Sequence, residues 1–322
     1  MSTHPFHGAL RVAALAFTLA LAAARADAQS LAGRVLHDGR GVGDVPVTLH
    51  RVTSDSSGPV GTALSSRDGS FSLTYPPADS AGGFTVFFAT AEFNGVRYFG
   101  PPLHPGDPGT GYEVAVFDTA SAARMPGAVQ VTRRDLIVLP EEDGSAEVNE
   151  IVRIRNAADR ALVLGSAAST WEFRLPAGVV AFDVGDARLG ADAVVRKDDR
   201  VLVTTTLPPG EQELFVRYRL PRGTRRTEVP LAAGTDTVNL FIRQPTSGTV
   251  VTGLEAPRVV EAEGDSFLRY SAAGLGGTDA VVMEWENPGL PPVDPRMAAV
   301  VVAGVVLTAG AGLAHRRRAR PA

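Results

Sequence analysis

The chain of 322 residues has no cysteine and only one lysine, Lys197, against 30 arginines. The absence of cysteine excludes disulfide scaffolds, thiolate zinc sites, iron–sulfur ligation and cysteine nucleophiles. The net charge is −4, with 31 basic and 35 acidic residues, so the chain lacks the basic excess that binding to a phosphate backbone requires. We therefore expect no nucleic-acid partner. The strong preference for arginine over lysine is typical of a GC-rich bacterial genome.

Histidine is also scarce, and between the two ends of the chain only His37, His50 and His104 occur. No HExxH pair, GxSxG elbow, phosphate loop or dinucleotide fingerprint is present. His37 and His50 are expected on neighbouring strands, where two ligands without a third would hold a metal only weakly. Residues 264–268, GDSFL, resemble the nucleophile block of GDSL-type hydrolases. The only histidine that follows is His315 near the end of the chain, in a part that we expect in the cytoplasm, so no base is provided. The sequence thus predicts no catalytic residue, no cofactor and no metal site.

Two other groups of polar and aromatic residues have alternative readings. The aspartates of residues 183–199 would suit calcium, but the D-x-D-x-D spacing is missing, so we interpret them as solvated turn residues. They are Asp183, Asp186, Asp192, Asp198 and Asp199. Trp171 and Trp285 are expected in a sandwich core, with a sugar-stacking platform as the alternative.

The amino-terminal 28 residues have the pattern of a secretory signal. Arg11 precedes an apolar run over residues 12–24, and the small residues Ala26 and Ala28 stand on either side of Asp27. The apolar run has 13 residues, whereas a membrane span needs about 20, so a cleaved signal is favoured over an uncleaved anchor. We expect the mature chain to begin near Gln29.

Residues 297–314 are free of charge, and residues 315–322 form a basic tail containing Arg316, Arg317, Arg318 and Arg320. This pattern predicts one transmembrane helix with a cytoplasmic stop, rather than a buried core helix. Residues 29–296 carry 25 basic and 34 acidic side chains, so the acidic part would be exported.

Small residues recur along one side of the expected helix, at Gly304, Thr308 and Gly312. Such spacing permits close helix packing and self-association through the membrane, although the whole segment is rich in small residues.

Prolines at 288, 291, 292 and 295 predict a stiff extended stalk over residues 288–296. The stalk also invites comparison with bacterial sorting signals. Residues 290–294, LPPVD, lack the Thr and Gly of the sortase pattern LPxTG. Val293-Asp294-Pro295 more closely resembles the Pro-Glu-Pro tails processed by exosortases, with two of three positions changed. A retained anchor is the favoured interpretation, and a processed tail is the alternative.

Residues 29–119 show short alternating strands separated by turn residues, which is typical of an all-β sandwich. The segment contains Asp38-Gly39, an alternating run over residues 45–49, Asp68-Gly69 and a hairpin signal at Asn94-Gly95. Its turn and core positions, above all residues 68–73, DGSFSL, resemble those of the carboxypeptidase regulatory-like domain. The resemblance implies a transthyretin-like β-sandwich that serves as a folding or adhesive module, without peptidase activity.

Residues 120–128 are expected to form a linker because they combine small residues with Pro126-Gly127. Residues 129–287 again alternate with period two, so we expect a second sandwich. The Pro208-Pro209-Gly210 step resembles the turn of bacterial immunoglobulin-like domains. Because about 160 residues exceed one sandwich of about 100, a split near residues 221–227 stays open.

The sequence as a whole predicts an all-β protein with two or three tandem sandwiches, transthyretin-like and then Ig-like, plus one carboxy-terminal transmembrane helix. We expect a non-catalytic binding or scaffolding protein of the bacterial cell envelope, anchored in the inner membrane with its domains in the periplasm or outside. Its expected partners are the lipid bilayer and an envelope protein or polysaccharide. A substrate of a tail-sorting system is the alternative, and a hydrolase without a recognisable motif is the third reading.

Overall fold

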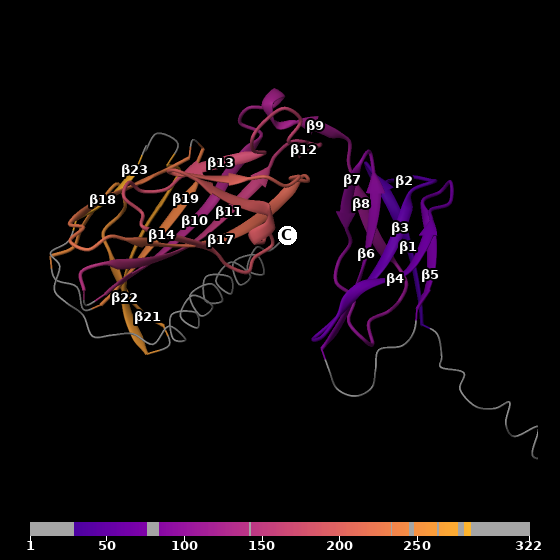
Figure 1. Cartoon of the computed structure of the whole chain (residues 1–322), viewed down its shortest axis with the longest axis horizontal. Helices are drawn as coiled ribbons and strands as arrows, with labels where there is room; N and C mark the ends of the chain where they lie inside the picture. Colours follow the sequence, from indigo (N-terminus) through magenta and orange to yellow (C-terminus); the bar gives the residue numbers. More distant parts are fainter. Residues whose placement is uncertain are drawn as a thin grey trace, which may run out of the picture. The chain divides into compact units, whose positions relative to one another are not determined.

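The computed structural model describes residues 29–75, 84–141, 143–232, 234–244, 248–262, 264–275 and 280–284. These residues form strands and two short 3₁₀ helices, so the expected all-β class is confirmed. The chain divides into two compact units, Met1–Phe117 and Asp118–Ala322, which we call the first and second unit (Figure 1). Within the described part of the chain, no helix is both long and apolar enough to cross a bilayer.

Several expectations fall on residues outside the described ranges. They are the signal at residues 1–28, the stalk at 288–296, the transmembrane helix at 297–314 with Gly304, Thr308 and Gly312, and the tail at 315–322 with Arg316, Arg317, Arg318 and Arg320.

The first unit consists of two four-stranded sheets. One sheet runs in the order β2-β1-β5, and its fourth strand, β8, pairs in parallel with β1. The other runs in the order β4-β3-β6-β7 and is antiparallel throughout. The strands are β1 (Gln29–His37), β2 (Arg40–Gly41), β3 (Pro46–Thr53), β4 (Ser57–Leu64), β5 (Ser70–Tyr75), β6 (Thr85–Phe93), β7 (Val96–Phe99) and β8 (Tyr112–Val116).

Alternating side chains from both sheets build the core of the first unit. Val47 and Leu49 of β3 are fully buried, as are Leu31 and Val35 of β1. The intervening residues of these strands are more exposed, which is the period-two pattern expected of a sheet with one buried face. The Asn94-Gly95 signal is confirmed, because both residues adopt positive φ in the turn between β6 and β7.

Tyr112 of β8 joins the two sheets of the first unit through its hydroxyl. The hydroxyl accepts a hydrogen bond from the Ala89 amide at 2.9 Å and donates one to the Pro101 carbonyl at 2.5 Å. Burial raises the pKa of the Tyr112 hydroxyl above its usual value. Folding therefore favours the neutral hydroxyl, and the stability it provides is complete below about pH 10 and is lost as the pH rises further.

We expect Tyr112→Phe to lower the free energy of unfolding of the first unit by about 1–3 kcal/mol at pH 7, because the buried Ala89 amide loses its acceptor. Urea unfolding at pH 7 and pH 11 measures both effects. The wild type should lose more stability between these pH values than the variant. The variant should still lose some stability at pH 11, because it keeps Tyr75, whose pKa is also raised by burial. An equal alkaline loss in both proteins would contradict the role of Tyr112.

The second unit is built on one seven-stranded sheet in the order β14-β17-β11-β10-β19-β22-β21. Two three-stranded sheets, β13-β16-β15 and β18-β23-β20, and the pair β12-β9 complete it. The strands are β9 (Thr119–Ser121), β10 (Val129–Pro140), β11 (Ala146–Asn156), β12 (Ala161–Val163), β13 (Trp171–Arg174), β14 (Ala181–Val184), β15 (Val194–Lys197), β16 (Arg200–Val203), β17 (Gly210–Leu220), β18 (Arg226–Pro230), β19 (Thr237–Arg243), β20 (Val250–Thr252), β21 (Arg258–Ala262), β22 (Asp265–Ala273) and β23 (Ala280–Glu284). The 3₁₀ helices are η2 (Ala122–Arg124) and η3 (Ala191–Ala193).

A single apolar cluster fills the main core of the second unit. It combines the inward side chains of the seven-stranded sheet, such as Leu136 and Val148, with Phe173 of β13 and Met283 of β23. Because strands before and after residues 221–227 share this core, the structure places no domain boundary there. A smaller cluster lies on the opposite face of the same sheet and contains Ile137, Leu139, Ile151, Phe241 and Phe267.

Two details of the second unit differ from the expectation. Strands β10 and β19 pair in parallel within the seven-stranded sheet, whereas an Ig sandwich has two antiparallel sheets of three to five strands.

Residues 120–128, expected as a linker, contain part of β9 and all of η2, and β9 pairs with β12. Small residues and Pro126-Gly127 thus mark a turn inside the unit, since the backbone of this segment is hydrogen-bonded to the unit that follows it.

Candidate functional site

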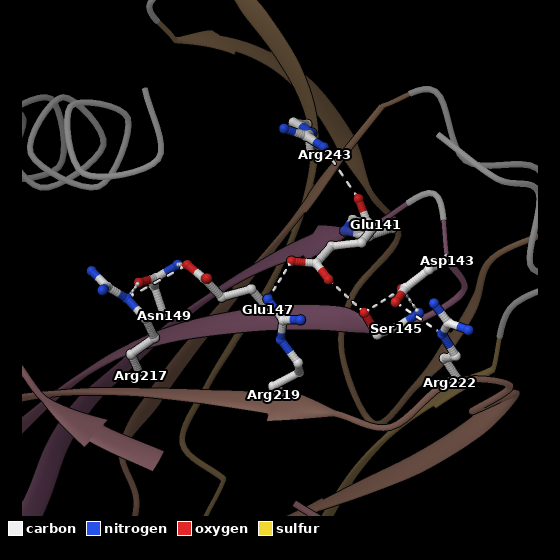
Figure 2. Close-up of polar contacts among 10 residues, drawn as sticks. Glu141, Asp143, Ser145, Glu147, Asn149, Arg217, Arg219, Arg222 and Arg243 are labelled. Atoms are coloured by element: carbon white, nitrogen blue, oxygen red, sulfur yellow. Dashed lines mark hydrogen bonds and ion pairs between the residues drawn. The ribbon is translucent and has the colours of Figure 1, made fainter. Parts of the chain in front are cut away.

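A polar network of the described residues lies where the β10–β11 hairpin meets the end of β17 (Figure 2). We call it the hairpin network, and it contains Glu141, Asp143, Ser145, Glu147, Asn149, Arg217, Arg219 and Arg222. The Asp143-Gly144 turn that joins β10 to β11 brings the carboxylates together, with Gly144 at a φ of 81°. Strand β17 pairs in register with β11, so its arginines lie opposite the hairpin.

Ser145 lies at the centre of the hairpin network and is only 6% exposed. Its Oγ is 2.5 Å from Glu141 Oε2 and 2.6 Å from Asp143 Oδ1. The Ser145 amide also donates to Asp143 Oδ1 at 2.9 Å. Because a hydroxyl carries one proton, Ser145 donates to one of the two carboxylates at a time.

Arginines neutralise the same carboxylates from the outside. Arg219 Nη2 lies 2.8 Å from Glu141 Oε1, and Arg222 Nε lies 2.9 Å from Asp143 Oδ2. Figure 2 shows Glu141 between Arg219 and Ser145. The side-chain and backbone hydrogen bonds from Ser145, followed by Arg222, hold the pKa of the Asp143 carboxyl well below its usual range.

Within the hairpin network, Asp143 is poorly suited to act as a base. A carboxylate with a strongly lowered pKa is a poor proton acceptor, so Asp143 cannot activate the Ser145 hydroxyl efficiently near neutral pH. Among the described residues of the turn, Glu141 and Asp143 each have an arginine partner that balances the carboxylate charge. We interpret the hairpin network as a clasp that fixes the β10–β11 turn to β17.

A second group of charges is completely buried in the main core of the second unit. Arg134 of β10 is 1% exposed, and Glu150 of β11 is 0% exposed. Arg134 Nε and Nη2 both contact Glu150 Oε1, at 2.6 and 2.5 Å. Nη1 donates to the Pro230 carbonyl, and the guanidinium lies over the Phe173 ring at 5.4 Å.

Tyr218 completes this buried triad by donating its hydroxyl proton to Glu150 Oε2 at 3.2 Å. Burial, and then the negative charge of Glu150, raise the pKa of Tyr218 well above its usual value. Tyr218 is therefore a neutral donor at any physiological pH. The triad has no exposed atom through which to meet a ligand, so its role is internal to the fold.

His37, His50 and His104 are not brought together. His37 and His50 lie in different sheets of the first unit, contrary to the expectation of neighbouring strands, because β3 crosses to the second sheet. His37 packs against the Phe93 ring at 5.3 Å, and His104 Nδ1 lies 3.4 Å from Asp107. Among the residues that the structure describes, no three metal-binding side chains gather as a metal site would require.

The five aspartates of residues 183–199 are all exposed and spread over different elements. Asp183 lies within β14, which corrects its interpretation as a turn residue, and Asp192 lies in η3. Asp198 adopts a φ of 55° in the β15–β16 turn, as expected of a turn aspartate. These positions do not form a joint calcium site.

The remaining candidates have structural roles where the structure describes them. Gly264 adopts a φ of 90° between β21 and β22, and Asp265 and Ser266 are the first two residues of β22 rather than a turn before it. Trp171 stacks on Phe173 with centroids 5.4 Å apart and packs against the main core. Trp285 lies outside the described residues.

One surface was not anticipated from the sequence. On the outer face of the sheet β4-β3-β6-β7, His50 stacks on Phe88 with centroids 5.1 Å apart and an interplanar angle of 10°. Phe99 lies next to Phe88 at 5.9 Å, and 66% of its surface is exposed. We call His50, Phe88 and Phe99 the aromatic face. The signal for it was the alternation of β6, which places an aromatic residue on both faces at Phe87 and Phe88.

Comparison with known proteins assigns no family to the chain. No protein-family model matches it, and no curated protein matches its sequence. Solved structures that resemble part of it include an M1 zinc metallopeptidase from Deinococcus radiodurans, with 11% identity and a TM-score of 0.30 over 49% of this chain and 42% of that chain. A putative protease from Parabacteroides distasonis has 10% identity and a TM-score of 0.29 over 48% and 40% of the two chains. The chain spans less than half the length of these proteins, and a likeness at this level defines neither its family nor its activity.

Proposed function

We propose that this protein is a membrane-anchored binding module of the bacterial cell envelope, which displays two β-sheet units on the exported side of the inner membrane. The observation that carries the proposal is the uncharged segment of residues 297–314 followed by four arginines, together with an acidic exported part. The first unit would be a transthyretin-like sandwich and the second an Ig-like variant, with a proline stalk that holds both away from the bilayer.

The charge chemistry of the described residues supports binding rather than catalysis. The hairpin network pairs its carboxylates with arginines, and the buried triad is closed to solvent. The aromatic face, in contrast, presents aromatic side chains to solvent on one sheet of the first unit. Exposed aromatic side chains of this kind are typical of recognition surfaces.

Removal of residues 297–322 tests the anchor. The full-length protein is expected in the membrane fraction and should resist extraction at alkaline pH, because about 18 apolar residues are held in hydrocarbon. The truncated protein should appear in the soluble periplasmic fraction. Deletion of residues 315–322 alone is the matched control, and it should keep the protein in the membrane. A full-length protein extracted at alkaline pH would contradict the anchor.

The same preparation separates the retained anchor from a processed tail. Intact mass of the mature protein should include residues 297–322. A mass that ends near Pro295 would favour the sorting alternative, in which the tail is cut and the exported units are released or attached to the surface.

A further inference from the structure

The outer face of the sheet β4-β3-β6-β7 carries three aromatic rings beside the Arg97–Glu92 ion pair. The registers place His50 opposite Phe88, and Thr90 opposite both Thr48 and Phe99. Phe99 therefore lies one row along the sheet from the stacked His50 and Phe88 rings. The three rings form a continuous aromatic strip across the neighbouring strands β3, β6 and β7.

Polar groups without net charge surround this strip. His50 Nε2 is 3.1 Å from Thr90 Oγ1, and Thr48 and Thr62 lie opposite each other on the adjoining strands. Burial, and then Arg97, lower the pKa of His50, so its imidazole is neutral at pH 7. The face thus offers hydroxyl and imidazole groups for hydrogen bonding beside its rings.

The charges at the border of the strip cancel each other. Arg97 Nη2 lies 2.7 Å from Glu92 Oε1, on neighbouring strands β7 and β6. Among the described residues of this face, Arg97 and Glu92 therefore balance each other and form neither a positive patch for an anionic lipid, nucleic acid or acidic polysaccharide nor a negative patch for a basic peptide. Its electrostatic match is an uncharged ligand.

The small size of the strip also favours a sugar chain over a protein partner. An aromatic side chain buries about 150–250 Å² at most, and two of the three rings are already half-buried. The strip falls short of the roughly 800 Å² per partner of a stable protein interface. A narrow strip of rings is sufficient for an extended sugar chain, whose rings have apolar faces for stacking and hydroxyl groups at their edges.

We propose that the aromatic face of the first unit binds a neutral polysaccharide, with Phe88 and Phe99 stacking against sugar rings and His50 beside them as a hydrogen-bonding group. This inference rests on the proposed function, because it names the ligand that the exported module would meet. The described contacts assign Phe99 the largest share of the binding surface, since it is the most exposed of the three rings.

Native gels that contain soluble starch, laminarin or mannan test the proposal on the full-length protein, purified in a detergent without a sugar headgroup. At least one of these neutral glycans should retard the wild type. Phe99→Ala should weaken the retardation at least tenfold, because it removes an exposed ring without disturbing the core. Val259→Ala is the matched control, since Val259 is 65% exposed on β21 of the second unit, and it should behave as the wild type.

Each other outcome overturns the proposal. Retardation by none of the glycans, equal retardation of Phe99→Ala and the wild type, or retardation only by the anionic polysaccharide alginate would reject a neutral-glycan surface. A fall in oligomeric state in Phe99→Ala without glycan binding would instead assign the face to a second copy of the chain. The anchoring experiment is independent: if anchoring fails while Phe99-dependent retardation persists, only the membrane part of the proposed function is lost.

Discussion

Replacing Glu150 by glutamine is expected to lower the free energy of unfolding of the second unit by about 3–5 kcal/mol. Glutamine keeps the shape of the side chain but removes its charge, which leaves the Arg134 guanidinium unpaired at 1% exposure. Urea unfolding followed by tryptophan fluorescence isolates this unit, because both tryptophans, Trp171 and Trp285, follow residue 117. The transition midpoint should fall without a change in the transition of the first unit.

Glu172→Gln is the matched control for the buried pair. Glu172 forms an ion pair with Arg200 on neighbouring strands, but both side chains are at least 40% exposed. Removing an exposed pair costs about 0–1 kcal/mol. Similar losses in Glu150→Gln and Glu172→Gln would contradict the view that burial makes the Arg134–Glu150 pair so costly to break.

A triple replacement, Arg134→Met with Glu150→Leu and Tyr218→Phe, separates two contributions to the free energy of unfolding. One is the loss caused by leaving a single buried charge unpaired, and the other is the net stabilisation by the intact ion pair. All three buried polar groups are removed together, so no charge of the triad is left unpaired, although the Pro230 carbonyl loses its donor Arg134 Nη1. We expect this variant to be more stable than Glu150→Gln. Tyr218→Phe belongs in the set because its hydroxyl would otherwise lose the Glu150 acceptor.

Individual strands and turns of the fold could be predicted from the sequence. Alternation predicted the run at residues 45–49 and the period of two in residues 129–287, because one buried face imposes this period. The turns at Asn94-Gly95 and Asp143-Gly144 were also predictable, since positive φ at a specified position restricts the residue types. These signals are local in the sequence. They identify single strands and turns, but they do not show which strands pair in a sheet.

The arrangement of the sheets could not be predicted in the same way. The parallel pairing of β10 with β19 joins residues about 100 positions apart, and no local pattern records which strands will be neighbours. The alternation of β10 also hid the buried triad, since Arg133 and Arg134 look equally suited to solvent. Only the structure shows that Arg134 faces the main core, while Arg133 pairs with Asp135 on the other side.

The aromatic face was missed for a related reason. Phe87 and Phe88 are adjacent in β6, so one must point inward and the other outward, but the sequence does not say what lies beside the outward ring. His50 and Phe99 come from strands that the register of the sheet places next to Phe88. A surface built across three strands depends on that register, and register is a property of the folded chain.

Gly41→Ala is expected to destabilise the first unit by about 3 kcal/mol. A Cβ on Gly41 would lie 1.8 Å from the carbonyl oxygen of Asp68, in the turn that precedes β5. Arg34 holds the same oxygen from another direction, with Nη2 at 2.6 Å, so the turn cannot withdraw without losing this contact. For a unit of this size the loss corresponds to a fall of roughly 10–20 °C in melting temperature, measurable by circular dichroism.

Gly58→Ala is the matched control in the same unit. A Cβ on Gly58 would meet no atom within 4 Å, so this alanine should change the melting temperature by no more than a few degrees. Tryptophan fluorescence reports the second unit and should be unaffected by either change. Equal melting of both variants would mean that the Asp68 turn moves away from Gly41 at little cost. The close contact between Gly41 and the Asp68 carbonyl would then not explain the glycine at position 41.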